Sequence, residues 1–263
     1  MKKNSVSLTT DSSRIIRDND NLRDAYHSLN PGDLILGRIR LKSTEEHILL
    51  DLSERGVILF PSALSQLSCR SKTSQALLFA PQMLPHTRAI HDIHDMLAAM
   101  NHYQQAKISQ VITKRDRSNA GMGINLWNST EEVFNQASLG SMPFPFVMQP
   151  FHPNCRDIRI IVLGSYVEAY WRCNPDNFRN NLHFGGNSSP CQLTKEQWDL
   201  CQKVMARGKF PYAHIDLIVT EDGSSFLAEI NLRGGIRGAK IKPDEYRQRL
   251  NDLHRKAEKD LSS

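Results

Sequence analysis

Residues 214–240 read HIDLIVTEDGSSFLAEINLRGGIRGAK. The runs HIDLIV and SFLAEIN have the pattern of two strands, and the Asp-Gly pair between them is a strong hairpin signal. Because side chains alternate across a strand, Glu229 and Asn231 point to one face, where Asp216 of the partner strand can join them. These oxygen ligands suit a hard cation such as Mg²⁺ that bridges to nucleotide phosphates, although a solvated polar face explains the same pattern.

Composition indicates an ordinary globular protein. The chain has 263 residues, of which 40% are hydrophobic and 23% charged, which predicts one compact body of two or three subdomains. The net charge of +5 fits an anionic small-molecule or protein substrate, and the lack of an arginine-rich run makes nucleic acid the weaker partner. The five cysteines are scattered without a CxxC pair, and no apolar run approaches the roughly 18 residues of a membrane span. We therefore expect a reduced cytoplasmic protein with no membrane partner.

Apolar periodicity predicts an α/β arrangement of elements. Residues 87–101 have apolar side chains at helical spacing, with Thr87 as a possible N-cap. Thr194 with Gln197 three residues later predicts the capping box of another helix. The remaining expected helices are a segment with helical spacing at residues 62–79 and a charged helix at the C-terminus. Strands are expected at residues 33–37, 56–60, 108–114, 146–151, 157–163 and 167–172, and residues 47–52 fit a short helix or a strand.

A possible phosphate-binding loop follows the strand that ends at Lys114. Gly121 and Gly123 would let backbone amides approach phosphate oxygens, and the lysine would add a positive charge. The GxxxxGK[ST] pattern is absent, and an ordinary flexible hairpin loop also accounts for these glycines.

Another strand leads to Gln149, Pro150 and Phe151, an edge that can offer backbone groups to a nucleobase. A crossing between domains explains this segment equally well.

Several arginines follow this edge. Asp157 and Arg159 share one strand face, and Arg172 lies on the strand expected beside them. A loop reading FRNNLHFGG follows, with Arg179 and Asn181 inside it. Arginines near a carboxylate cluster would hold a polyphosphate or a substrate carboxylate by bidentate contacts.

In this order, the pieces resemble the RimK-like branch of the ATP-grasp superfamily, which contains the ribosomal-protein glutamate ligase. The resemblance covers about residues 68–240 and adds Lys72, ahead of the Pro85-His86-Thr87 turn, as a phosphate-binding lysine. It implies the ATP-grasp fold, in which two α/β subdomains hold ATP between them. We expect a shortened N-terminal α/β (pre-ATP-grasp) region at residues 1–78, a lid subdomain at 79–148 and a catalytic subdomain at 149–263.

The resemblance also implies a role for each matching residue. The Mg²⁺ (or Mn²⁺) ligands would be Asp216, Glu229 and Asn231. The phosphates of ATP would meet Lys72, Lys114 and the loop of Gly121 and Gly123. The adenine pocket would be lined by Gln149, Pro150 and Phe151. The γ-phosphate and the acyl substrate would face Arg159, Arg172, Arg179 and Asn181.

Two departures from the family pattern bear on the substrate. Pro150 replaces an acidic residue in the adenine strand, which removes a backbone donor there. After Asn231, the cations Arg233, Arg237 and Lys240 stand where relatives have neutral and acidic residues. These cations predict an anionic substrate. The chain also resembles a less characterised group of ATP-grasp enzymes labelled by a GAK system.

The expected activity is that of an ATP-dependent carboxylate–amine (or thiol) ligase that forms an acylphosphate. Its substrate would be a small molecule, a peptide or a protein, and a homo-oligomer is left open. Two alternatives share the nucleotide residues: an ATP-grasp kinase with a phosphorylated product, and a catalytically silent regulatory module that only binds nucleotide.

Overall fold

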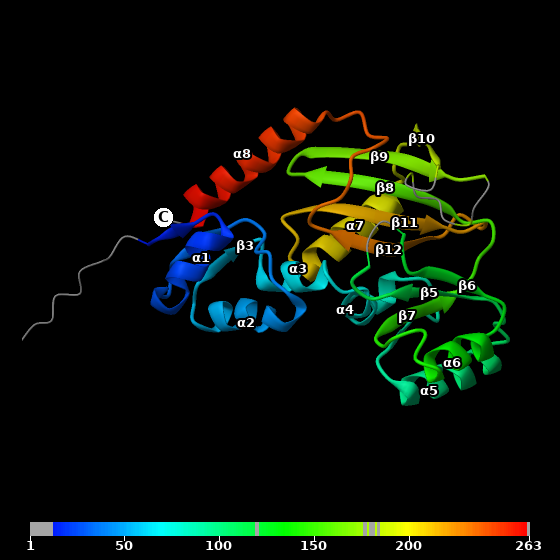
Figure 1. The fold of residues 1–263 in the computed structure, drawn as a ribbon. Helices are drawn as coiled ribbons and strands as arrows, with labels where there is room; N and C mark the ends of the chain where they lie inside the picture. Colours follow the sequence, from blue (N-terminus) through cyan, green and yellow to red (C-terminus); the bar gives the residue numbers. More distant parts are fainter. Residues whose placement is uncertain (1–12, 119–120, 176–177, 179–181, 183–184, 262–263) are drawn as a thin grey trace, which may run out of the picture. The chain divides into compact units, whose positions relative to one another are not determined.

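The computed structural model describes residues 13–118, 121–175, 178, 182 and 185–261. Helices and sheets share this part of the chain, which confirms the expected α/β class (Figure 1). The chain divides into two compact units, Met1–Ala63 with His254–Ser263 and Leu64–Leu253. Among the described helices, none combines the length and hydropathy that crossing a bilayer requires.

The first unit contains, in its described residues, a parallel sheet in the order β1-β2-β3. Its strands are β1 (Ile15–Ile16), β2 (Leu34–Leu36) and β3 (Ile58–Phe60). Parallel neighbours need crossover connections, which run through α1 (Asn19–Ala25), η1 (Tyr26–Ser28), η2 (Ser43–Glu45) and α2 (His47–Glu54). Leu34 and Leu36 pack with Ala257 of α8 (Pro243–Leu261) in a small core.

The second unit has two sheets, and the first is antiparallel with the described order β4-β7-β5-β6. Its strands are β4 (Arg88–Ile90), β5 (Val111–Arg115), β6 (Ile124–Trp127) and β7 (Phe146–Pro150). Helices α5 (Ile93–Gln105) and α6 (Thr130–Ser138) supply Tyr103 and Val133 to a core that also contains Phe146. Because all three side chains are fully buried, this core fixes the sheet against its helices.

The expected helix over residues 87–101 is wrong at its start. Residues 88–90 form β4 and pair with β7, and the helix begins only after Asp92. The Asp92 carboxylate accepts hydrogen bonds from the N–H groups of His94 and Asp95 at 2.8 and 2.9 Å, so Asp92 is the N-cap. Ile90 fits helical spacing as well as a strand, and only the distant β7 decides between them.

The other sheet of this unit is antiparallel, with the described order β10-β9-β8-β11-β12. Its strands are β8 (Arg156–Leu163), β9 (Tyr166–Cys173), β10 (Asn187–Pro190), β11 (Tyr212–Val219) and β12 (Ser225–Asn231). The hairpin β11–β12 closes as expected, with the Gly223 N–H donating to the Thr220 carbonyl at 2.9 Å. Helix α7 (Lys195–Gly208) carries the predicted capping box of Thr194 and Gln197.

A helical segment follows β3 in the chain and precedes β4. It comprises α3 (Ala63–Ser68), α4 (Lys72–Leu78) and η3 (Ala80–Gln82). Helix α4 packs on β4 and β7 of one sheet and on β12 of the other. The sequence patterns did not predict β1, α1, β4, β6, β10 or α6.

Candidate active site

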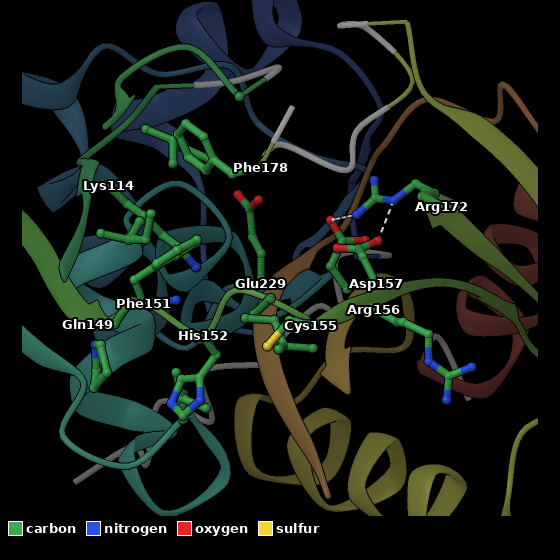
Figure 2. Close-up of a pocket in the computed structure, with 18 of the residues that line it drawn as sticks. Lys114, Gln149, Phe151, His152, Cys155, Arg156, Asp157, Arg172, Phe178 and Glu229 are labelled. Atoms are coloured by element: carbon green, nitrogen blue, oxygen red, sulfur yellow. Dashed lines mark hydrogen bonds and ion pairs between the residues drawn. The ribbon is translucent and has the colours of Figure 1, made fainter. Parts of the chain in front are cut away.

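A cavity of about 230 Å³ is lined by both sheets of the second unit and by α4 (Figure 2). The four-stranded sheet supplies Ile112, Lys114, Ile124, Gln149 and Pro150. The five-stranded sheet supplies Arg156, Asp157, Arg159, Arg172, Asp216, Ile218, Ala228 and Glu229. With Lys72, five basic side chains face three carboxylates, and this excess of positive charge favours an anionic ligand.

Four buried or half-buried side chains form a charge network, which comprises Asp157, Arg159, Arg172 and Asp216. Strand pairing places Asp216 opposite Arg159 and Asp157 opposite Arg172. Arg159 binds both carboxylate oxygens of Asp216, with Nη2 donating to Oδ2 at 2.8 Å. The Nε of Arg172 donates to Asp157 at 2.5 Å, and its Nη2 lies 2.9 Å from Asp216 (Figure 2). Each of these charges is therefore matched, as charges removed from water require.

The pKa values of the two acids in the charge network shift in opposite directions. Burial opposes ionisation of Asp216, but the guanidinium groups of Arg159 and Arg172 outweigh it and lower the pKa of Asp216 to about 2. Burial raises the pKa of Asp157, because Arg172 only partly offsets it and the Asp216 charge adds to it. Asp216 is therefore the firmly ionised carboxylate of the pair.

Glu229 lies directly opposite Asp216 on the neighbouring strand. The register of β11 and β12 shifts just beyond this pair, so Ala228 has no partner in the ladder and lines the cavity. A bulge of this kind re-aims the adjacent side chain and is common beside active sites. Like charges directly opposite each other are destabilising, so the pair of Asp216 and Glu229 needs cations nearby.

Lysines stand close to this carboxylate pair. The Nζ of Lys72 lies 3.4 Å from Glu229 and donates to the backbone carbonyl of Ser118 at 2.5 Å. Burial lowers the pKa of Lys114; the Glu229 carboxylate opposes this shift, and the charge of Lys72 adds to it. A bound anion would favour the charged form of Lys114.

The predicted glycine loop joins β5 to β6 over residues 115–123. The Arg115 N–H donates to the Gly123 carbonyl at 2.8 Å. Gly123 has φ +77°, and a Cβ there would lie 2.8 Å from the Cβ of Arg115, so the turn requires glycine. Gly121 lines the cavity, whereas Gly123 closes the hairpin behind it.

The expected nucleobase edge is mostly apolar. Pro150 has no N–H, and the N–H of Phe151 already donates to the Gln110 carbonyl at 3.0 Å. The Gln149 side chain lines the cavity and forms no hydrogen bond in the described part of the chain. The surrounding apolar surface comes from Leu84, Ile112, Phe151, Phe178 and Ile218.

The model of the RimK-like ATP-grasp domain matches residues 68–245, which is more than half of the chain. The chain belongs to the RimK-like ATP-grasp family. It is 25% identical over 213 residues to human N-acetylaspartylglutamate synthase A, covering 77% of this chain and 54% of that protein. It is 38% identical over 86 residues to the tetrahydromethanopterin:alpha-L-glutamate ligase of Methanocaldococcus jannaschii, covering 32% of this chain and 29% of that protein. The chain therefore spans about half the length, or less, of these curated relatives.

Solved structures confirm the ATP-grasp fold. D-cycloserine synthetase DcsG has a TM-score of 0.61 at 13% identity and covers 92% of this chain and 98% of its own. The ATP-grasp ligase PsnB, complexed with a minimal precursor, Mg and ADP, has a TM-score of 0.59 at 14% identity and covers 95% and 100%. At these identities the likeness shows the fold alone, and the finer resemblance to the GAK-system group stays a prediction.

Most of the predicted ATP-grasp residues lie together in the cavity. They are Lys72, Lys114, Gly121, Gln149, Pro150, Phe151, Arg159, Arg172, Asp216 and Glu229. Asn231 is half-buried on β12 and is not among the described residues that line the cavity. Arg179 and Asn181 lie outside the described residues. Arg233, Arg237 and Lys240 follow β12, are exposed, and form no ion pair with the part of the chain that the structure describes.

The sequence patterns predicted Pro150 and Phe151 but missed other apolar residues that line the cavity. Ile112 stands two residues before Lys114 on β5, and Ile218 stands two residues after Asp216 on β11. The alternation of strand side chains was therefore the signal that could have found them. Arg156 was also missed; its guanidinium lies 4.3 Å from the ring centre of Trp171.

Proposed function

We propose that this chain is an ATP-dependent ligase that activates a carboxylate as an acylphosphate and transfers the acyl group to an amine (or thiol). The observation that carries the proposal is the arrangement in one cavity of two lysines, a glycine loop, and a carboxylate pair backed by buried arginines. Membership of the RimK-like ATP-grasp family supports the same activity. Relatives named as a synthase and a glutamate ligase support it further; because the match covers only about half of those proteins or less, their substrates do not carry over.

The nucleotide would lie with its base against the apolar side of the cavity. Phe151 and Ile112 offer the surface that a base needs to leave water. The free carboxamide of Gln149 has a donor and an acceptor for the polar edge of adenine. Lys72, Lys114 and the backbone at Gly121 would then meet the phosphates.

The donor set fits Mg²⁺ at the other end of the nucleotide. Asp216 and Glu229 present carboxylates from neighbouring strand positions, and Asn231 adds a carboxamide oxygen two residues along β12. Hard oxygen donors of this kind suit Mg²⁺, which takes one or two carboxylates together with substrate phosphates. When bound, the metal would neutralise charge on the phosphates.

Arg159 and Arg172 would orient the reacting groups. Both are charged at any physiological pH, and Asp157 and Asp216 hold their guanidinium planes in place. Pre-oriented donors of this type stabilise charge that develops on a transferring phosphoryl group. By family pattern Arg179 and Asn181 would act beside them.

The proposed reaction has two steps. A carboxylate oxygen of the substrate attacks the γ-phosphorus, the bond to the β–γ bridging oxygen breaks, and ADP leaves. The amine then attacks the acyl carbon, phosphate leaves with the bonding electrons, and the nitrogen loses a proton. The chain's own contribution is positioning and charge neutralisation, because phosphoryl transfer needs little covalent chemistry from the protein.

An anionic acyl or amine substrate fits the region after β12. Arg233, Arg237 and Lys240 are exposed and lack ion-pair partners among the described residues. Unpaired cations of this kind attract anions and speed their association. A di- or polycarboxylate, or an acidic peptide, is therefore the substrate class we propose.

The test is ATP turnover by the purified chain against a panel of amino acids and carboxylates. We expect ADP and phosphate to appear in equal amounts with an amide or thioester product, and the strongest responses from anionic compounds. Release of AMP would contradict the acylphosphate route. A phosphorylated end product would indicate the kinase alternative, and nucleotide binding without turnover across the panel would indicate the silent module.

A further inference from the structure

Gln75 of α4 lies near the cavity but does not line it. Its side chain is buried, and all of its polar groups are hydrogen-bonded. It is 1% exposed, and its Nε2 donates to the carbonyl groups of Ser68 at 3.0 Å and Ile230 at 2.9 Å. Its Oε1 accepts from the N–H of Ile230 at 2.9 Å. Both amide hydrogens and the carbonyl oxygen therefore have partners.

The Ile230 contacts occur at a particular place on β12. This strand is at the edge of the described five-stranded sheet. Apart from an isolated parallel bridge between Leu227 and Met83, its outer N–H and C=O groups have no neighbouring strand. Gln75 satisfies both groups of Ile230 and so takes the place of a strand at that residue. Ile230 lies between Glu229 and Asn231, so the bonds fix the backbone that carries both predicted metal ligands.

The same helix holds the phosphate side of the cavity. Lys72 stands three residues before Gln75, on the same helical face, and reaches both Glu229 and the Ser118 carbonyl. At the start of the helix, the Asp116 carboxylate of the glycine loop accepts hydrogen bonds from Ser71 Oγ and the Thr73 N–H, both at 3.1 Å. Helix α4 thus ties the glycine loop of one sheet to the carboxylate strand of the other.

We infer that Gln75 is a positioning residue that fixes Glu229 and Asn231 relative to Lys72 and thereby tunes metal affinity. The inference rests on the proposed Mg²⁺–ATP site, although Gln75 itself touches neither metal nor nucleotide. Its two bonds to the backbone of one residue, Ile230, make the placement selective, because a shift of β12 by one residue would break both. Outer-shell partners of this kind typically change metal affinity about 10–100-fold when they are removed.

The experiment measures ADP binding by calorimetry while Mg²⁺ is titrated, in the wild type and two Gln75 variants. Gln75→Glu is nearly isosteric and keeps an acceptor for the Ile230 N–H, but the ionised carboxylate has no hydrogen for the two carbonyl groups. Gln75→Met keeps the volume and removes every hydrogen bond. We expect the half-saturating Mg²⁺ concentration to rise at least about tenfold in both, while ADP affinity in EDTA stays unchanged.

Gln197→Met is the matched control. Gln197 is also a buried glutamine, and its Nε2 donates to Ser225 Oγ at the far end of the same strand. The control should lower the melting temperature as the Gln75 variants do and leave the Mg²⁺ requirement at the wild-type value. Folded Gln75 variants with the wild-type Mg²⁺ requirement would overturn the inference alone. A wild type whose ADP affinity ignores Mg²⁺ would overturn the proposed site and the inference with it.

Discussion

The two walls of the cavity differ in how their residues are held. The apolar wall, from the four-stranded sheet, has Ile112, Ile124, Gln149 and Pro150 with the single cation Lys114. The charged wall, from the five-stranded sheet, has three carboxylates and three arginines. Apolar contacts are non-directional and tolerate small shifts, whereas a buried carboxylate and guanidinium must keep their geometry or leave a charge unmatched.

The two walls should therefore contribute to different functions of the site. The apolar wall can contribute affinity for a flat base, and the charged wall can contribute metal binding and orientation of the reacting groups. Substitutions in the apolar wall should therefore weaken nucleotide binding, whereas substitutions in the charged wall should impair metal binding and turnover.

Replacing Asp216 with Asn should have the largest effect. It removes a predicted metal ligand and leaves Arg159 and Arg172 with one carboxylate, Asp157, between them. We expect ATP turnover to fall about 10²–10³-fold, the cost of losing one preorganised electrostatic group. Asp199→Asn, which removes an exposed ion pair with Lys195 on α7, is the control and should keep full turnover. Wild-type turnover in Asp216→Asn would refute the metal-site assignment.

Replacing Lys114 with Met should weaken nucleotide binding without damaging the fold. The side chain is half-buried and its pKa is lowered by burial, so an apolar substitute suits the unliganded site. We expect ADP affinity to fall about 10–100-fold, the value of a charge-assisted hydrogen bond to phosphate. Calorimetry measures it, with the exposed Lys203→Met as the control. An unchanged dissociation constant would remove Lys114 from the phosphate site.

Replacing Phe151 with Ala tests the apolar wall by itself. The ring lines the cavity and lies 6.4 Å from that of Phe178, so truncation removes surface that a base would cover. We expect about tenfold weaker ADP binding, consistent with partial loss of one buried aromatic side chain. The Mg²⁺ requirement should not move, and Leu97→Ala on an exposed face of α5 should have no effect. A shift in the Mg²⁺ requirement would show that the walls are not independent.

Reversing the charge of Arg237 should have the smallest effect on the nucleotide. The side chain is exposed beyond β12 and is not among the described residues that line the cavity. We expect the KM for an anionic substrate to rise several-fold in Arg237→Glu, as for one solvent-screened charge pair, with ATP affinity unchanged. Lys203→Glu, an equal change in net charge on α7, is the control. Unchanged substrate and ATP affinities together would sink the anionic-substrate proposal.

Local patterns in the sequence predicted the charged wall well. The two-residue alternation in Asp157-Ile158-Arg159 and Glu229-Ile230-Asn231 places polar side chains on one face, and the Asp-Gly pair sets the hairpin that brings strands together. Asn231 lies on the predicted strand yet outside the described lining, because alternation fixes a face and not a position along the strand.

Local sequence patterns could not predict contacts between segments that lie far apart in the chain. The local pattern of residues 88–90 predicts a helix, because the strand that pairs with them, β7, lies more than 50 residues away in the chain. The bonds of Gln75 to Ile230 span 155 residues, and no local pattern marks them. Helix α6 had a usable signal, since Ser129 caps it and the carboxylate of Glu132, three residues later, accepts a hydrogen bond from the N–H of Asn128.

We propose that the charged wall, and not the apolar wall, couples Mg²⁺ to the nucleotide. The most direct test compares ADP affinity with Mg²⁺ and with EDTA in the wild type, Glu229→Gln and Phe151→Ala. We predict that Mg²⁺ tightens ADP binding in the wild type and in Phe151→Ala, and that Glu229→Gln loses this gain while keeping at least the wild-type affinity in EDTA. A full Mg²⁺ gain in Glu229→Gln, or no gain in the wild type, would contradict the account.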